Sequence, residues 1–165
     1  MREKRVNLHL SFQHDGIDFE FTAELKPGEP YAFCVGEKIL AQRLFEEIWR
    51  SRRKSGIDVL AIGDRTMFLP RKTLSKNIYL SLRLRHSREE ASARTKDLLD
   101  MYGLDEFAND RVKTLSDEKL LALALARSHF RVPGLVVINR CGGYLSHEDD
   151  FDLSRYGNAF IVEIT

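Results

Sequence analysis

The sequence predicts an α/β protein with a mainly parallel β-sheet, an antiparallel β-hairpin at its N-terminus and an inserted helical subdomain. Two stretches of alternating apolar and polar residues flank the turn Asp15-Gly16, which is typical of a hairpin. Further along, short strands that are apolar on both faces alternate with helices, the order of a parallel sheet joined by right-handed crossovers. We expect one domain over residues 1–165, with a sheet core at 1–72 and 113–165 and a helical insertion at 73–112.

Composition excludes several classes of protein. Of the 165 residues, 43% are hydrophobic and 31% are charged, an ordinary mix for a globular protein. The net charge is only +1, which argues against a protein whose main task is to bind nucleic acid. No apolar run is long enough to span a membrane, and the charged first residues do not resemble a secretory signal. Two cysteines, Cys34 and Cys141, cannot build a disulfide framework. We therefore expect a cytoplasmic protein.

The first half of the chain contains the hairpin and one β-helix-β unit. Alternation runs from Val6 to Phe12 and resumes from Ile17 to Leu25. Residues 31–36 are apolar on both faces and end in glycine, as a central strand does, and residues 58–63 form a similar strand. The helix between them has an apolar stripe that we expect to pack into the core. The stripe consists of Leu40, Leu44, Phe45, Ile48 and Trp49.

The second half is helical before it returns to strands. Ser87 and Glu90 match a capping box, and Gly103 is placed to end the helix that the box opens. A further helix is expected from Ser116, with an apolar body that indicates burial on more than one side. Residues 135–138 and 159–165 are apolar enough for two buried strands.

The order of these segments resembles the P-loop NTPase-like nucleotide-binding domain of ABC-type ATPases. Residues 115–119 read Leu-Ser-Asp-Glu-Lys and lead through a helix to Ala126-Arg127, then to Pro133-Gly134 and an apolar strand. This run is similar to the family's Leu-Ser-Gly-Gly-Gln signature, the helix after it and the Walker B strand. Residues 73–78 resemble the Thr-Val-x-Glu-Asn segment after the family's Q-loop.

The position of the phosphate-binding loop lacks the residues that such a loop needs. Glycines let backbone N–H groups surround the phosphates, a Lys neutralises them and a hydroxyl holds Mg²⁺. Aligned without a gap from Gly36, the chain has Ile39 and Ala41 where glycines are expected, Gln42 in place of the Lys and Arg43 in place of the hydroxyl. Side chains with a Cβ do not readily adopt the positive φ that glycine supplies.

The other catalytic positions are replaced as well. Asp64 stands where the resemblance places the Q-loop Gln, and Asn139 where it places the Walker B Asp. Arg140 takes the place of the neighbouring Glu, the general base. Because arginine stays protonated at any physiological pH, base catalysis from this position is excluded.

The signature is altered in charge. After Ser116, Asp117 and Glu118 replace two glycines, so that acids stand where the bound phosphates of a partner would approach. Ser146 replaces the D-loop Asp. We expect a catalytically inactive ABC ATPase-like domain, a pseudoenzyme with no catalytic residue, cofactor or metal.

The resemblance implies action through a protein partner: a membrane permease subunit, an active ATPase domain or a second copy. The chain has no transmembrane segment of its own, so that a partner would supply any association with a membrane. Residues Met67, Phe68 and Leu69 fall where the family receives a permease, and a buried role for them is equally expected.

Two alternatives come from other classes of function. An altered nucleotide or anion site would use Lys38, Arg43 and Arg140. A nucleic-acid-binding regulator would use two basic loops, although the scarcity of aromatic residues between their cations argues against it. The acidic residues near the C-terminus match no metal site, and Cys141 with His147 lacks the third group of a nucleophilic site. The basic loops contain Arg50, Arg52, Arg53 and Lys54, and Arg83, Arg85, His86 and Arg88; the acidic cluster is His147, Glu148, Asp149, Asp150 and Asp152.

Overall fold

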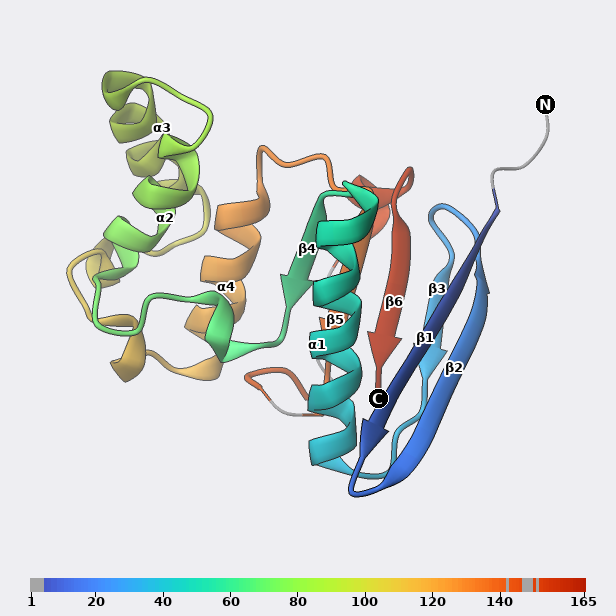
Figure 1. Ribbon diagram of the computed structural model, residues 1–165. Helices are drawn as coiled ribbons and strands as arrows, with labels where there is room; N and C mark the ends of the chain where they lie inside the picture. The colour runs from blue at the N-terminus through green and yellow to red at the C-terminus, as the bar shows by residue number, and fades with distance from the viewer. Residues whose placement is uncertain (1–4, 142, 147–149, 151) are drawn as a thin grey trace. The chain divides into compact units, whose positions relative to one another are not determined.

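The computed structural model describes residues 5–141, 143–146, 150 and 152–165, with the backbone alone for residues 52–55. The chain divides into two compact units (Figure 1). Residues 1–64 and 132–165 form the sheet unit, and residues 65–131 form the helical unit.

The core of the sheet unit is a four-stranded parallel sheet, in the order β3-β6-β5-β4. Its strands are β3 (Pro30–Phe33), β4 (Val59–Ile62), β5 (Leu135–Asn139) and β6 (Phe160–Ile164). Every residue of β4 and β5 is buried, as their apolar sequences predict. The strand predicted at 31–36 differs: β3 is shorter and lies at an edge, because β6 pairs between it and β5. Its first three residues are therefore exposed.

The N-terminal hairpin is confirmed. Strands β1 (Val6–His14) and β2 (Ile17–Leu25) pair antiparallel from Val6 opposite Leu25 to His14 opposite Ile17. The two turn residues, Asp15 and Gly16, both have positive φ, as a type I′ turn requires. Because an isolated hairpin is marginal in water, its apolar face must pack elsewhere. Phe21 contacts Phe33 of β3 edge to face, with ring centroids 5.5 Å apart.

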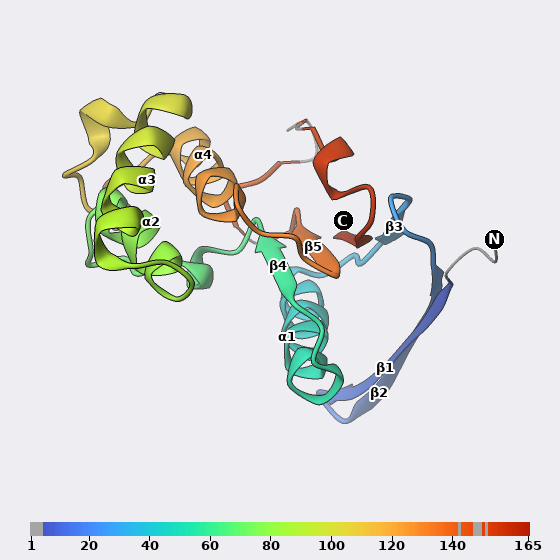
Figure 2. The same ribbon diagram turned by 90° about the horizontal axis from the view of Figure 1, so that it is seen from above.

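Helix α1 (Lys38–Ser55) lies on one face of the parallel sheet, beside the hairpin (Figure 2). It packs against β5 and β1. Of the predicted stripe, Leu44, Phe45 and Ile48 are buried. Leu40 and Trp49, at its two ends, are half-buried. The rings of Phe45 and Trp49 stack on each other with centroids 6.5 Å apart. A short 3₁₀ turn, η4 (Ser154–Tyr156), precedes β6.

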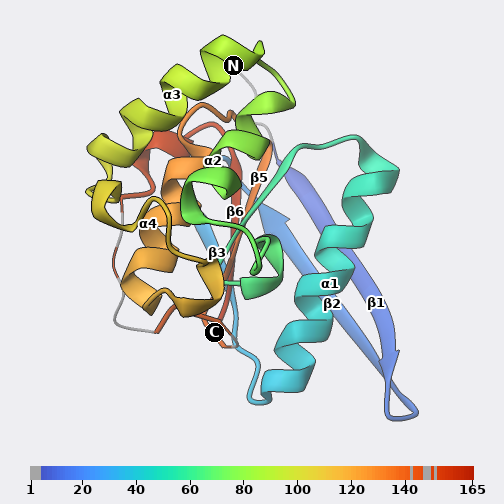
Figure 3. The same ribbon diagram turned by 90° about the vertical axis from the view of Figure 1, so that its left-hand side faces the viewer.

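The helical unit falls between β4 and β5 in the chain, and its helices are drawn in green to orange in Figure 3. Helix α2 (Leu74–Arg83) packs against both α3 (Arg88–Met101) and α4 (Asp117–Ser128). The remaining elements are the 3₁₀ turns η1 (Arg65–Met67), η2 (Asp105–Phe107) and η3 (Val112–Thr114). The mixed architecture confirms the predicted α/β class.

Of the capping box predicted at the start of α3, the bond to the Ser87 side chain forms, while the Glu90 side chain has other partners. The Ser87 hydroxyl accepts a hydrogen bond from the Glu90 N–H at 3.1 Å. The Glu90 carboxylate pairs with His86 and Arg94, because each of these residues lies four positions away along the chain. Gly103 has a φ of +63° after the helix, as expected of an αL cap.

Candidate functional site

The carboxyl edge of the parallel sheet is the place to look for a site, because ligands of open α/β sheets bind outside the carboxyl ends of the strands. Gly36 follows β3, Asp64 follows β4, and Asn139 and Arg140 end and follow β5. Parallel pairing of Ile62 with Ile138 brings the ends of β4 and β5 to this edge together. Four of the predicted positions therefore share one edge of the sheet unit.

The segment at the phosphate-loop position is helical. α1 begins at Lys38, two residues after Gly36, and the Ala41 N–H donates to the Glu37 carbonyl at 2.9 Å. That N–H is thereby used inside the first turn, where a phosphate loop would direct it at its ligand. Gly36 does not have a positive φ, and a Cβ added to it would meet open space. Nothing in the local backbone requires a glycine there.

Gln42 and Asp64 form a hydrogen bond with each other. The Gln42 amide Nε2 donates to Asp64 Oδ2 at 3.2 Å. Asp64 is 4% exposed, and a buried carboxylate needs such donors. In the ABC-type pattern these positions are those of the phosphate-binding Lys and the Q-loop Gln. In this chain the side chains at the two positions form a hydrogen bond with each other.

Arg140, at the position of the general base, is held by two acceptors. Its Nε donates to Glu163 Oε2 of β6 at 3.2 Å, and its Nη1 donates to the Ser146 carbonyl at 2.9 Å. The side chains of Arg140 and Glu163 are only 12% and 18% exposed. This cation is neutralised by its own chain.

Asn139 is almost completely buried, at 1% exposure. Its Oδ1 accepts from the Cys141 N–H at 3.0 Å, while its Nδ2 has no hydrogen-bond partner among the described residues. The side chain thus shapes the start of the loop after β5. Burial raises the pKa of the Cys141 thiol next to it, which makes a nucleophilic role less favourable.

The ends of β4 and β5 meet through glycine backbones. Gly63 has a φ of +98°, and a Cβ on it would lie 2.1 Å from the Asn139 carbonyl oxygen. A Cβ on Gly143 would lie 1.3 Å from the Gly63 carbonyl oxygen. The loop after β5 therefore packs backbone to backbone against the residue that precedes Asp64. Sequence reasoning interpreted Gly63 only as the end of a strand, and the glycine after each strand is the signal that could have suggested this contact.

The signature-like segment starts α4 in the helical unit. Ser116 is the N-cap residue, with no side-chain capping bond. Asp117 forms an ion pair with Arg65. Glu118 is exposed in the same first turn, where the helix dipole favours acids. The sequence predicted this helix start and its acidic first turn; the pairing of Asp117 with Arg65 was not predicted.

The segment Met67–Leu69 is split between core and surface. Phe68 is 5% exposed and lies under the Arg127 guanidinium, whereas Leu69 is 47% exposed. The buried Asn77 amide fixes this segment: it accepts from the Leu69 N–H at 2.8 Å and donates to the Leu69 carbonyl at 3.1 Å. Burial and surface display are both present, at neighbouring residues.

The remaining candidates form no common site. Arg43 pairs with Glu46, as Arg140 does with Glu163, so that two cations of the alternative anion site have carboxylates of their own. Arg50 likewise pairs with Glu46 and Glu47. The side chains of Arg52, Arg53 and Lys54, and all of His147, Glu148 and Asp149, lie outside the described residues.

The acidic C-terminal cluster shows one local contact. The Ser154 N–H donates to Asp152 Oδ1 at 2.8 Å, and hydrogen bonds from Ser154 lower the pKa of Asp152. Within the described part of the chain, no group of three or more His, Cys, Asp and Glu side chains is arranged to hold a metal ion.

The comparisons with known proteins identify the fold. No family model matches the chain. No curated protein matches it either. Among solved structures, it is similar to a chain in the complex of the archaeal ribosomal stalk protein aP1 with the archaeal ribosome recycling factor aABCE1. That match has a TM-score of 0.58 and 16% identity, over 99% of this chain and 34% of the other. This chain therefore spans about a third of that neighbour.

A second similar structure is the ATP-binding cassette MJ0796 in a dimeric post-hydrolysis state with ADP and Pi. Its TM-score is also 0.58 and its identity 16%, with 99% of this chain and 88% of that one covered. The chain thus has an ABC ATPase-like fold. None of the helices in the described residues is both long and apolar enough to cross a membrane.

Proposed function

We propose that this chain is an ABC ATPase-like domain that does not hydrolyse ATP and acts by associating with other proteins of a transporter or ATPase assembly. One observation carries the proposal: Gln42 and Asp64, at two positions that serve the nucleotide in the family pattern, bind each other. The fold is ABC ATPase-like, while Gln42, Asp64 and Arg140 at its carboxyl edge are engaged in hydrogen bonds within the chain.

The geometry at the start of α1 argues against phosphate binding. α1 starts at Lys38, so the Ala41 N–H is bound to Glu37. A triphosphate would have to displace this helical turn and would meet a neutral amide at residue 42 instead of an ammonium group. The free energy for unwinding a helical turn would be subtracted from any affinity.

The residues at the end of β5 argue against ATP hydrolysis. A general base must accept a proton from the attacking water. Arg140 cannot accept one, because its guanidinium is already protonated at any physiological pH. Its ion pair with Glu163 also fixes the side chain against β6. Asn139 offers Mg²⁺ a neutral oxygen that already accepts from the Cys141 N–H, in place of the carboxylate that divalent cations prefer.

Association is what remains for such a scaffold. The similar MJ0796 structure is dimeric, and the similar aABCE1 structure is a complex. We propose that this chain likewise binds a permease subunit, an active ATPase domain or a second copy of itself, on the cytoplasmic side of a membrane.

Calorimetry and phosphate release test the proposal on the purified full chain. We expect no heat of Mg-ATP binding at millimolar nucleotide and no phosphate release above buffer, with a hydrolysing ABC ATPase as the positive control. Arg140→Ala is the matched variant, since trace hydrolysis by a contaminant would be unaffected by it. Micromolar Mg-ATP binding together with phosphate release that Arg140→Ala alters would contradict the proposal.

A further inference from the structure

The near-neutral total charge conceals a separation between the two units. The helical unit, residues 65–131, has fourteen Lys and Arg against nine Asp and Glu, a net of +5. The sheet unit has twelve against sixteen, a net of −4. The positive charge of the molecule is therefore concentrated in the helical unit.

Four of these cations come together on two segments that pair with each other; we call them the basic cluster. Residues 70–74 run antiparallel to residues 110–113, with Thr73 bridging Arg111. Three backbone hydrogen bonds of 2.9–3.1 Å join the segments, from Leu74 to Asp110, from Val112 to Lys72 and from Lys113 to Pro70. The basic cluster consists of Arg71, Lys72, Arg111 and Lys113.

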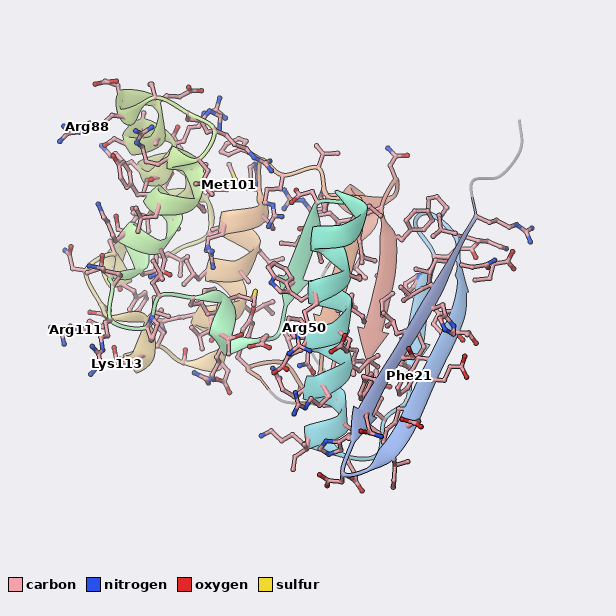
Figure 4. All side chains as sticks on the ribbon, in the orientation of Figure 1. Phe21, Arg50, Arg88, Met101, Arg111 and Lys113 are labelled. Carbon is pink, nitrogen blue, oxygen red and sulfur yellow. The ribbon has the colours of Figure 1, made fainter. Side chains whose placement is uncertain are left out.

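The backbone holds these cations toward solvent. Val112 is 3% exposed, so its neighbours Arg111 and Lys113 are directed away from the core, and both are exposed. Figure 4 shows the side chains of Arg111 and Lys113 near each other, projecting outward from the helical unit. Arg71 and Lys72 are exposed in the turn beside them.

The basic cluster is not neutralised. Over the described residues, none of its four side chains has an ion pair or a hydrogen bond, whereas Arg65 and Arg94 of the same unit each pair with a carboxylate. Asp110 is the one acid in the two segments. Gathering like charges without counter-charges is unfavourable in the isolated chain, which indicates that an anionic partner completes the surface.

The neighbours of the basic cluster indicate the kind of anion. Tyr79 of α2 and Phe107 of η2, on the elements next to the two segments in the chain, have rings covered by the ammonium groups of Lys76 and Lys119, at 4.6 and 4.0 Å from the ring centroids. Rings covered in this way do not provide the stacking platforms of single-stranded nucleic acid binding. The partner is therefore recognised by charge.

An exposed apolar side chain stands next to the charges. Leu69, at 47% exposure, shares a turn with Lys72, whose N–H donates to the Leu69 carbonyl at 3.0 Å. Asn77 fixes the backbone of Leu69, so that this leucine is held at the surface. A phosphate backbone makes no use of an exposed leucine, whereas the boundary between headgroups and acyl chains of a bilayer does.

We propose that the basic cluster binds the surface of a bilayer containing anionic phospholipids, with Leu69 inserted at headgroup depth. The helical unit would then contact lipid directly, in addition to any protein partner. The inference goes beyond the proposed function and does not depend on the absence of ATP hydrolysis, which vesicle binding does not measure.

Vesicle sedimentation of the full chain tests this inference. We expect binding to vesicles of phosphatidylcholine with added phosphatidylglycerol, no binding to phosphatidylcholine alone, and loss of binding as salt increases. The double variant Arg111→Gln/Lys113→Gln should partition about 30-fold more weakly, from ~1 kcal/mol per cation and about 1.4 kcal/mol per tenfold change. Leu69→Ser should also weaken partitioning.

The matched control is Arg88→Gln/Lys96→Gln, which removes the same charge from two exposed side chains of the same unit that have no ion pair within the described part of the chain. It should change partitioning less than threefold, as a non-specific effect of net charge. Equal losses in both double variants would overturn the basic cluster as the site, and no binding to anionic vesicles would overturn the inference as a whole. Salt-sensitive binding to duplex DNA or RNA that Leu69→Ser leaves unchanged would assign the cluster to nucleic acid instead.

Discussion

The Gln42 carboxamide donates a hydrogen bond of 3.2 Å to the Asp64 carboxylate, joining the start of α1 to the second residue after β4. Gln42 is half-buried and Asp64 is buried. The two residues are 22 positions apart, and only the β3-α1-β4 crossover brings them together. This contact is a largely buried bond within the sheet unit that stabilises the fold.

A double-mutant cycle measures the strength of this bond. Gln42→Ala and Asp64→Ala, singly and together, should give a coupling energy of about 1.5–3 kcal/mol in urea unfolding, because a buried hydrogen bond to a charged group is worth that much. The hairpin offers a matched control: Gln13 Nε2 donates to Asp18 Oδ1 at the same 3.2 Å, but in an exposed position. That pair should show no measurable coupling. Equal coupling in both pairs would show that burial does not strengthen the Gln42–Asp64 bond.

Two glycines at the same edge should differ greatly in the stability that substitution by alanine costs. Gly63→Ala places a Cβ 2.1 Å from a carbonyl oxygen at a φ of +98°, so we expect a loss of roughly 2–4 kcal/mol in the free energy of unfolding. Gly36→Ala meets open space without positive φ and should change stability by less than about 0.5 kcal/mol. Thermal unfolding compares the two variants, and Gly16→Ala isolates the effect of positive φ alone, since it has φ +78° and no near neighbour.

The elements of the fold could be predicted because their periodicity is local. The alternation from Val6 to Phe12 and the stripe through Leu44 and Ile48 each depend on one segment, and both elements formed as expected. The order of the strands in the sheet could not be predicted, because it depends on contacts between distant segments. Residues 31–36 have the composition of a central strand, yet β6 takes the place next to β5 and leaves β3 at the edge.

The same reason limits prediction of the site. Aligning Gly36 to Arg43 with a family motif treats the stretch as a loop that has lost its glycines. Its residues Ile39, Leu40 and Ala41 are helix formers with no breaker among them, and the structure makes them the first turn of α1. Partners such as Glu163 for Arg140 come from a distant strand, and no motif points to them.

The two cysteines should differ in reactivity. Cys34 is exposed, whereas burial raises the pKa of Cys141, and only the thiolate reacts with iodoacetamide. We expect Cys34 to be alkylated on the order of tenfold faster at neutral pH, as followed by mass spectrometry of intact protein. Cys34→Ser should leave a single slow site whose rate rises with pH. Fast modification of that variant would contradict the burial of Cys141.

The start of α3 should respond to acid. Desolvation raises the pKa of Glu90, but hydrogen bonds and charges from Arg94 and His86 outweigh it, so that the pKa lies below its ordinary value. The stabilisation that this pKa reflects is therefore present at neutral pH and is lost as the pH falls through the folded-state pKa. NMR titration should find the Glu90 pKa higher in Arg94→Gln than in the unaltered chain. Arg88→Gln, which removes a cation without a recorded partner from the same helix, should leave it unchanged.

A charge exchange tests whether Arg140 is a structural cation. Arg140→Glu should destabilise the fold more than Arg140→Gln, by about 1–2 kcal/mol, because it sets a second carboxylate against Glu163 at low exposure. Adding Glu163→Arg to Arg140→Glu should recover part of that loss, since opposite charges face each other again. The recovery is partial because the hydrogen bond that Arg140 donates to the Ser146 carbonyl is lost. Urea unfolding gives the energies.

Phosphate release should stay at the buffer level in all three variants, because a carboxylate at residue 140 does not restore the ammonium group missing at Gln42 or the phosphate loop that α1 replaces. Rescue of hydrolysis by Arg140→Glu alone would show that the helical turn after Gly36 opens to admit nucleotide.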